Sequence, residues 1–141
     1  MKKILFLLLL PITCFAQSEI SNFWEYGDGS RGISTVINDQ DDSYMIIKDK
    51  IEGSFVPILY LNPDGTFYST TTSECGNDCF YHSSGTFKKI DETHIQLQIK
   101  ESGQAGLCRG GSITNTEPRD LGIFEIKTYE DRYILIKINS K

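Results

Sequence analysis

The sequence predicts an all-β protein, built as a single-domain antiparallel meander of about eight strands that closes into a barrel. Three observations favour this class. Apolar residues recur at every second position, as in HIQLQIK, where Ile95, Leu97 and Ile99 alternate with polar residues. Turn-forming runs such as Asn-Pro-Asp-Gly at 62–65 separate these segments. No segment carries a convincing 3.6-residue apolar period of an amphipathic helix.

The chain begins with a segment of the secretory signal type. Two lysines precede an apolar run over 4–10, and small or polar residues follow up to Ala16. This order is typical of a cleaved export signal, and the run is too short to span a bilayer. We therefore predict a signal peptide at 1–16 and one β-barrel-like domain at 17–141. The mature chain is expected in the periplasm or outside the cell, with no transmembrane segment.

Cys14 offers an alternative, in which it becomes the lipidated N-terminus of an outer-membrane lipoprotein. A lipobox normally has Leu three residues before the cysteine and Gly or Ala immediately before it. Here those positions hold Pro11 and Thr13. The sequence therefore favours export without a lipid anchor.

Eight strands are expected in chain order, each as a run of alternating or β-branched residues. They lie at 33–38, 43–48, 54–61, 66–71, 85–90, 94–100, 122–128 and 132–139. Pro57 weakens the third strand, because proline has no N–H for the ladder.

The connections sort into two groups. Successive antiparallel strands reverse direction, so alternate connections lie at opposite ends of the barrel. This places the short turns at 39–42, 62–65, 91–93 and 129–131 at one end, which we call the tight end. The connections at 49–53, 72–84 and 101–121 then share the other end, which we call the open end. Long connections in compact domains often carry function, so the open end is the expected site.

The run LYLNPDGTF at 59–67 and the run GTFKKIDETHIQLQI at 85–99 resemble the repeated hairpin of bacterial secreted lipocalin-like domains. The resemblance covers about 54–100, and Trp24 stands where such a chain places its early tryptophan. It implies an eight-stranded barrel that binds a small apolar ligand in its mouth. It also implies that a partly empty cavity is lined by the inward side chains Phe67, Phe87, Ile95, Leu97, Ile99, Phe124, Ile126, Ile134 and Ile136. An eight-stranded barrel has an interior just wide enough for packed side chains or one small ligand.

Three cysteines and one histidine cluster in the predicted open-end loops: Cys75, Cys79, His82 and Cys108. They allow a disulfide between the two loops, by Cys79–Cys108 or Cys75–Cys108, a local Cys75–Cys79 bond, or a zinc site. An exported chain meets an oxidising compartment, where disulfides persist. We therefore favour a disulfide between the loops, with one thiol left over, and predict no metal.

Other patterns favour no specific chemistry. The acidic run at 38–42 is interpreted as a solvated turn, because an EF-hand counted from Asp39 would need Gly and Glu where Tyr44 and Lys50 stand. Lys and Arg total 14 against 19 Asp and Glu, and the leader holds two of the lysines. This acidic balance disfavours a nucleic-acid partner.

The sequence contains no defensible catalytic constellation, so we predict a binding protein that is not an enzyme and has no cofactor. The leading hypothesis is a small apolar ligand in the barrel mouth. The alternative is a protein–protein interaction module, such as an enzyme inhibitor or a toxin-immunity protein, that docks an envelope or extracellular partner. Its contact residues would come from the open-end loops: Phe80, Tyr81, His82, Arg109 and Arg119. A barrel interior filled by side chains would favour the alternative.

Overall fold

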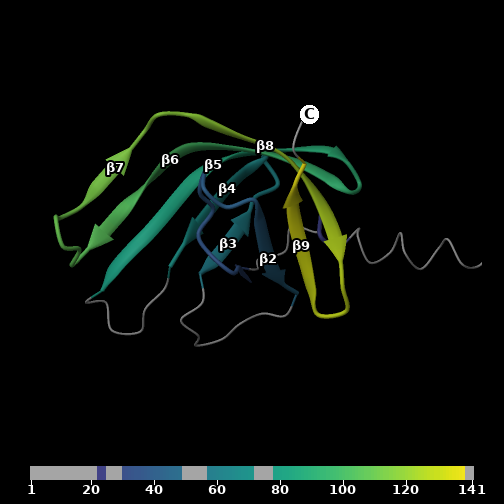
Figure 1. The fold of residues 1–141 in the computed structure, drawn as a ribbon, viewed down its shortest axis with the longest axis horizontal. Helices are drawn as coiled ribbons and strands as arrows, with labels where there is room; N and C mark the ends of the chain where they lie inside the picture. Colours follow the sequence, from purple (N-terminus) through teal and green to yellow (C-terminus); the bar gives the residue numbers. More distant parts are fainter. Residues whose placement is uncertain (1–21, 25–29, 49–56, 72–77, 139–141) are drawn as a thin grey trace, which may run out of the picture.

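The computed structural model describes residues 22–24, 30–48, 57–71 and 78–138. These residues form an all-β fold without a helix, in which nine strands share one antiparallel sheet (Figure 1). The strands are β1 (Arg31–Gly32), β2 (Ser43–Ile47), β3 (Ile58–Leu61), β4 (Thr66–Thr70), β5 (Cys79–Asp91), β6 (His94–Gly106), β7 (Ile113–Asn115), β8 (Arg119–Thr128) and β9 (Arg132–Lys137). The predicted fold class is confirmed.

The sheet nearly closes into a barrel through the short segment at 31–34. The strand order is β1-β3-β4-β5-β6-β8-β9-β2, with β7 beside β6. β1 pairs with β3, and the next residue, Ile33, bridges Ile46 of β2, so the two ends of the order meet. Two backbone hydrogen bonds reinforce the junction, from Ile33 N to Pro57 O at 2.8 Å and from Ser34 N to Met45 O at 2.9 Å. Closure leaves few free edges for unwanted pairing.

The second strand departs from the expected order. β2 pairs with β9, as in Tyr44 opposite Leu135, and not with β3. Since every pairing in the sheet is antiparallel, β2 and β3 point the same way, and the chain between them starts and ends at opposite ends of the barrel. Lys48 N, just after β2, donates a hydrogen bond to Asp131 O in the tight-end turn at 129–131, so β2 ends at the tight end. The predicted 49–53 connection itself lies outside the described residues.

The expected strand at 33–38 is wrong beyond Ile33. Residues 34–42 instead make bends across the open end, and this places the acidic run there and not at the tight end. Asn38 explains the change, because its Oδ1 accepts hydrogen bonds from Gln40 N at 2.7 Å and Asp41 N at 3.0 Å. Such side-chain bonds to nearby backbone compete with ladder formation.

The other three short turns do lie at the tight end, where the N-terminal segment at 22–24 contacts the 91–93 turn. Trp24 Nε1 donates to Glu92 O at 3.0 Å, in the turn between β5 and β6. The ring of Phe23 packs edge-on against Trp24 and Tyr133, with centroids 5.0 and 5.1 Å away. These aromatic side chains close the tight end of the barrel.

β5 and β6 are longer than expected, at 13 residues each. Residues 79–84 pair with 101–106, and β7 adds a third strand at 113–115. We call these three stretches the arm; Figure 1 shows it reaching past the rest of the barrel on the left. The CFYHSS and ESGQAG runs lack apolar alternation because the arm covers no core, so the pattern gave no strand signal there.

Side chains fill the barrel interior. Among the described residues, seventeen buried hydrophobic side chains form one cluster, to which the strands and the 22–24 segment contribute. Seven of the nine residues predicted to face inward belong to it: Phe67, Phe87, Ile95, Leu97, Ile99, Phe124 and Ile126. The prediction is wrong for Ile134 and Ile136, since Tyr133 and Leu135 occupy the inner face of β9. Both faces of β9 are apolar, so alternation could not tell them apart.

Candidate functional site

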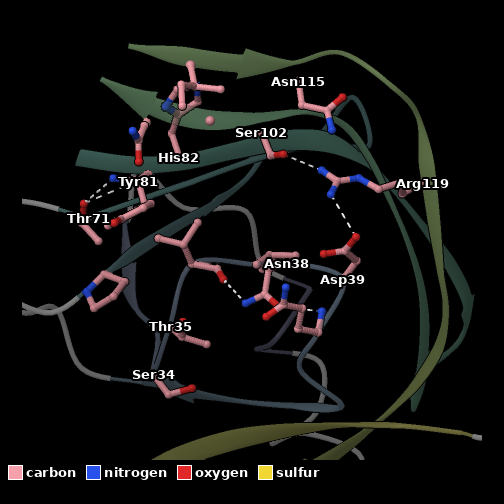
Figure 2. Close-up of a pocket in the computed structure, with 17 residues that line it drawn as sticks. Ser34, Thr35, Asn38, Asp39, Thr71, Tyr81, His82, Ser102, Asn115 and Arg119 are labelled. Atoms are coloured by element: carbon pink, nitrogen blue, oxygen red, sulfur yellow. Dashed lines mark hydrogen bonds and ion pairs between the residues drawn. The ribbon is translucent and has the colours of Figure 1, made fainter. Parts of the chain in front are cut away.

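A pocket of about 610 Å³ lies at the open end, between the arm and the segment at 34–40, which we call the floor (Figure 2). Among the seventeen residues of the buried cluster, only Ile37 lines it. The pocket is therefore separate from the packed interior. Its size is in the range of small-molecule sites, which is roughly 300–1,000 Å³.

The arm supplies the roof of the pocket through one face of its sheet. Ser83 is fully buried, and its cross-strand partner Ser102 lies opposite Asn115 of β7. Two pairs further along, on the same face, Tyr81 lies opposite Gln104, which pairs with Ile113. Directly paired residues share a face, so this roof carries hydroxyl, amide and phenol groups and one apolar side chain, that of Ile113.

The floor is held by a buried tyrosine. Tyr44 Oη donates to Asn38 O at 2.7 Å and accepts from Asn38 N at 3.1 Å. Burial raises the pKa of Tyr44 to about 12, with smaller contributions from nearby aspartates. Asn38 Nδ2 also donates to Asp41 Oδ2 at 2.7 Å. These bonds fix the backbone that faces the arm.

Arg119 joins the floor to the arm. Its Nη1 lies 3.0 Å from Asp39 Oδ2, and its Nη2 donates to Ser102 Oγ (Figure 2). Its Nε is buried and has no partner among the described residues. The Arg119 side chain is 25% exposed against 44% for Asp39, so the pair is partly screened from water. The charge of this arginine is already neutralised within the pocket.

The residues proposed from the sequence divide between two faces of the arm. Tyr81 and Arg119 reach the pocket. His82 also lines it, but because Ser83 faces inward, the His82 ring turns to the outer face, where Nε2 lies 3.8 Å from Glu101 Oε1. Phe80 lies on that outer face as well, packed over Gly106.

Arg109 is exposed in the turn between β6 and β7 and does not line the pocket. Sequence reasoning missed the floor and the polar roof, notably Asn38, Asp39, Ser102, Gln104 and Asn115. The acidic run at 38–42 was the one available signal, and the assumed strand order placed it at the wrong end.

One disulfide, Cys79–Cys108, has formed with an S–S distance of 2.05 Å. It is one of the two loop-to-loop pairings that the sequence allowed, and it joins the first residue of β5 to the β6–β7 turn. The local Cys75–Cys79 bond is wrong because Cys79 has another partner, and zinc cannot take the two bonded sulfurs. Cys75 lies outside the described residues. No group of three or more candidate metal ligands occurs in the part of the chain that the structure describes.

His94, Asp91 and Thr93 form a polar cluster at the tight end. Asp91 Oδ1 lies 2.8 Å from His94 Nδ1, and Thr93 Oγ1 lies 3.0 Å from the same nitrogen. Hydrogen bonds from His94 and then Thr93 lower the pKa of Asp91. A nucleophile–base–acid relay uses the two different ring nitrogens of histidine, and here both contacts share one. The cluster is a turn structure, not a relay.

Comparisons with protein-family models, with curated proteins and with solved structures gave no match to this chain. Among the described residues, no helix has the length and apolar character to cross a membrane. The function of the chain is therefore inferred from the geometry of its open end.

Proposed function

We propose that this chain is an exported, non-catalytic binding protein that docks another protein through its open end. The observation that carries the proposal is the filled interior: seventeen packed hydrophobic side chains occupy the space that a hollow barrel would offer to a ligand. The recognition chemistry of the barrel then lies outside the core. The disulfide supports export, since such bonds persist in oxidising compartments.

The arm has the composition of a protein-binding surface. Tyr81 is 55% exposed, Leu107 is 72% exposed and Ile113 is 56% exposed, and all three belong to the arm or its turn. Aromatic and arginine side chains are enriched at binding hot spots, and Arg119 lies beside this group. The disulfide restricts the tip of the arm before binding, which lowers the ordering cost of association.

Site-specific photo-cross-linking in the producing cell tests this proposal. A photoreactive phenylalanine analogue replaces Tyr81 or Leu107 at the open end. Tyr129 at the tight end, which is also exposed, serves as the control. The proposal expects a discrete cross-linked protein from the open-end positions only. Cross-linking from Tyr129 alone, or from no position, contradicts it.

A small ligand in the mouth is the second candidate, as the lipocalin-like resemblance implies. The pocket volume of about 610 Å³ favours it. An apolar fluorescent probe would then bind with one-to-one saturation, and Ile113→Asp would abolish that binding. Absence of saturable binding leaves protein docking as the account of this end.

A further inference from the structure

β7 presents an open strand edge beside the pocket. It pairs with β6 through Ser102–Asn115, Gly103–Thr114 and Gln104–Ile113. No described strand pairs with its other edge, and all three of its residues are exposed. Half of the backbone N–H and C=O groups of such a strand point away from its neighbour. These groups are a template for one more strand.

β7 is short, but it carries neither of the residue types that usually block a strand edge. Its sequence, Ile-Thr-Asn, contains no charged residue and no proline, and neither residue type interrupts its pairing with β6. A glycine lets it lie close: a Cβ at Gly103 would stand 2.1 Å from Ile113 O. The fold therefore holds this short strand tightly on one side and leaves the other side open.

The pocket lies under the same strand. Ile113 and Asn115 line it, so the inner face of β7 continues directly into the pocket wall. A strand added to β7 would extend the roof, and its alternate side chains would point to the pocket side. Backbone pairing and side-chain selection would thus meet at one place, as in other complexes formed by strand addition.

The charge of the open end selects the partner. Seven carboxylates lie in the segments 34–42, 78–84 and 101–120: Asp39, Asp41, Asp42, Asp78, Glu101, Glu117 and Asp120. The same segments hold two basic side chains, Arg109 and Arg119. Arg119 is paired with Asp39, and Lys137 of β9 lies 3.6 Å from Asp42, so the carboxylates at this end still outnumber the basic groups. A complementary partner carries Lys or Arg.

We propose that β7 accepts an extended segment of a partner protein, bearing Lys or Arg at alternate positions, as an additional strand of the sheet. This inference rests on the proposed function, because it names how the open end docks its partner. Three residues of β7 give only a few backbone hydrogen bonds, each worth about 1 kcal/mol net. The pocket and the acidic groups contribute the rest of the binding.

A peptide titration followed by ¹⁵N-resolved NMR tests the inference on the disulfide-bonded protein. The probe is a twelve-residue peptide of alternating Lys and Val, beside a Glu-Val copy and a Lys-Val copy N-methylated on every second residue. We expect the Lys-Val peptide to shift the amide signals of 113–115 and to slow their hydrogen exchange. The other two copies should bind about tenfold or more weakly, since one loses charge complementarity and the other loses backbone donors.

Paired proline variants locate the contact. Thr114→Pro removes a backbone donor within β7, and Thr116→Pro places the same residue just beyond it. Thr114→Pro should lose peptide binding about tenfold or more while the signals of β8 and β9 stay unchanged, and Thr116→Pro should retain it. The spectrum itself reports whether each variant folds.

Two outcomes overturn strand addition while protein docking at the open end survives. In the first, the N-methylated copy binds as well as the parent and shifts only the floor at 34–40. In the second, no basic peptide binds although photo-cross-linking from Tyr81 captures a protein. Failure of both the peptide and the cross-linking experiments overturns the proposed function as well.

Discussion

Arg119 Nη1 and Asp39 Oδ2 lie 3.0 Å apart, and the two residues are 80 positions apart in the chain. The contact joins the start of β8 to the floor, so one ion pair holds both walls of the pocket. An exposed ion pair contributes little to stability, about 0.2–1 kcal/mol, and this one is only partly covered. Its main effect is on the shape of the open end.

The first prediction concerns this pair. We expect Arg119→Ala and Asp39→Asn each to lower the free energy of unfolding by about 1 kcal/mol or less, and Arg119→Ala to weaken partner binding as well. Urea unfolding of both single variants and the double variant measures the coupling. A coupling of about 3 kcal/mol or more would show that the pair is a structural requirement of the barrel.

The disulfide gives the second prediction. The bond closes a sequence separation of 29 residues, so its loss should cost about 3.5 kcal/mol on the chain-entropy estimate. The double variant Cys79→Ser/Cys108→Ser should show this loss in urea unfolding, with the barrel core retained.

Thiol titration of the unfolded, unreduced mature chain provides the control for that result. If the leader with Cys14 is cleaved, only Cys75 is outside the bond, and one reactive thiol per chain is expected. Three reactive thiols would contradict the bond in the exported protein.

Two glycines with the same backbone angle form a matched pair for the third prediction. Gly65 has φ +81 and a Cβ there would lie 3.3 Å from Phe87 O, whereas Gly111 has φ +80 and open space around it. Alanine at either position is strained by positive φ, at a cost of about 1 kcal/mol. Gly65→Ala should cost more in thermal unfolding than Gly111→Ala, because only Gly65 is also crowded.

Neither glycine lines the pocket, so neither substitution should remove binding through direct contact. If Gly111→Ala proved the more damaging of the two, the crowding argument at Gly65 would be wrong.

The fourth prediction concerns alkaline pH. Burial in the folded state raises the pKa of Tyr44 to about 12 from its ordinary value of 10.0, so folding favours the neutral phenol. The stabilisation from this shift is complete below pH 10 and is lost as the pH rises from 10 to 12. Unfolding at a series of pH values should show this fall.

Tyr44→Phe should flatten that alkaline slope while costing about 1 kcal/mol at neutral pH, through the lost bonds to Asn38. Tyr129→Phe, at an exposed turn position, is the control and should change neither quantity. A slope that persists in Tyr44→Phe would assign the alkaline transition to another group.

The fold class could be predicted from the sequence because the two-residue period of β-strands shows in local alternation. Ile95, Leu97 and Ile99 alternate with polar residues, and all three are buried as expected. The prediction of inward residues was wrong for β9, because Ile134 and Ile136 are as apolar as Tyr133 and Leu135 on the opposite face. Which face turns inward there depends on pairing with β2 and β8, which a single strand does not encode.

The site was harder to predict because it depends on strand order. Tyr81 and Arg119 were found from residue type and loop length, but the floor was not, since it was expected as a strand leading to a tight-end turn. The side chain of Asn38 accepts backbone hydrogen bonds that end the expected strand. Because β2 pairs with β9, the acidic run that precedes β2 lies at the open end. Long-range closure of this kind leaves no local pattern.

Hydrogen exchange of the complex with its cross-linked partner tests the central claim most directly. The account predicts that binding slows exchange in the floor at 34–40 and in the arm at 79–84, 101–106 and 113–115, and leaves the tight-end turns at 62–65 and 129–131 unchanged. Protection confined to the tight-end turns or to the outer face of β3 and β4 would contradict it.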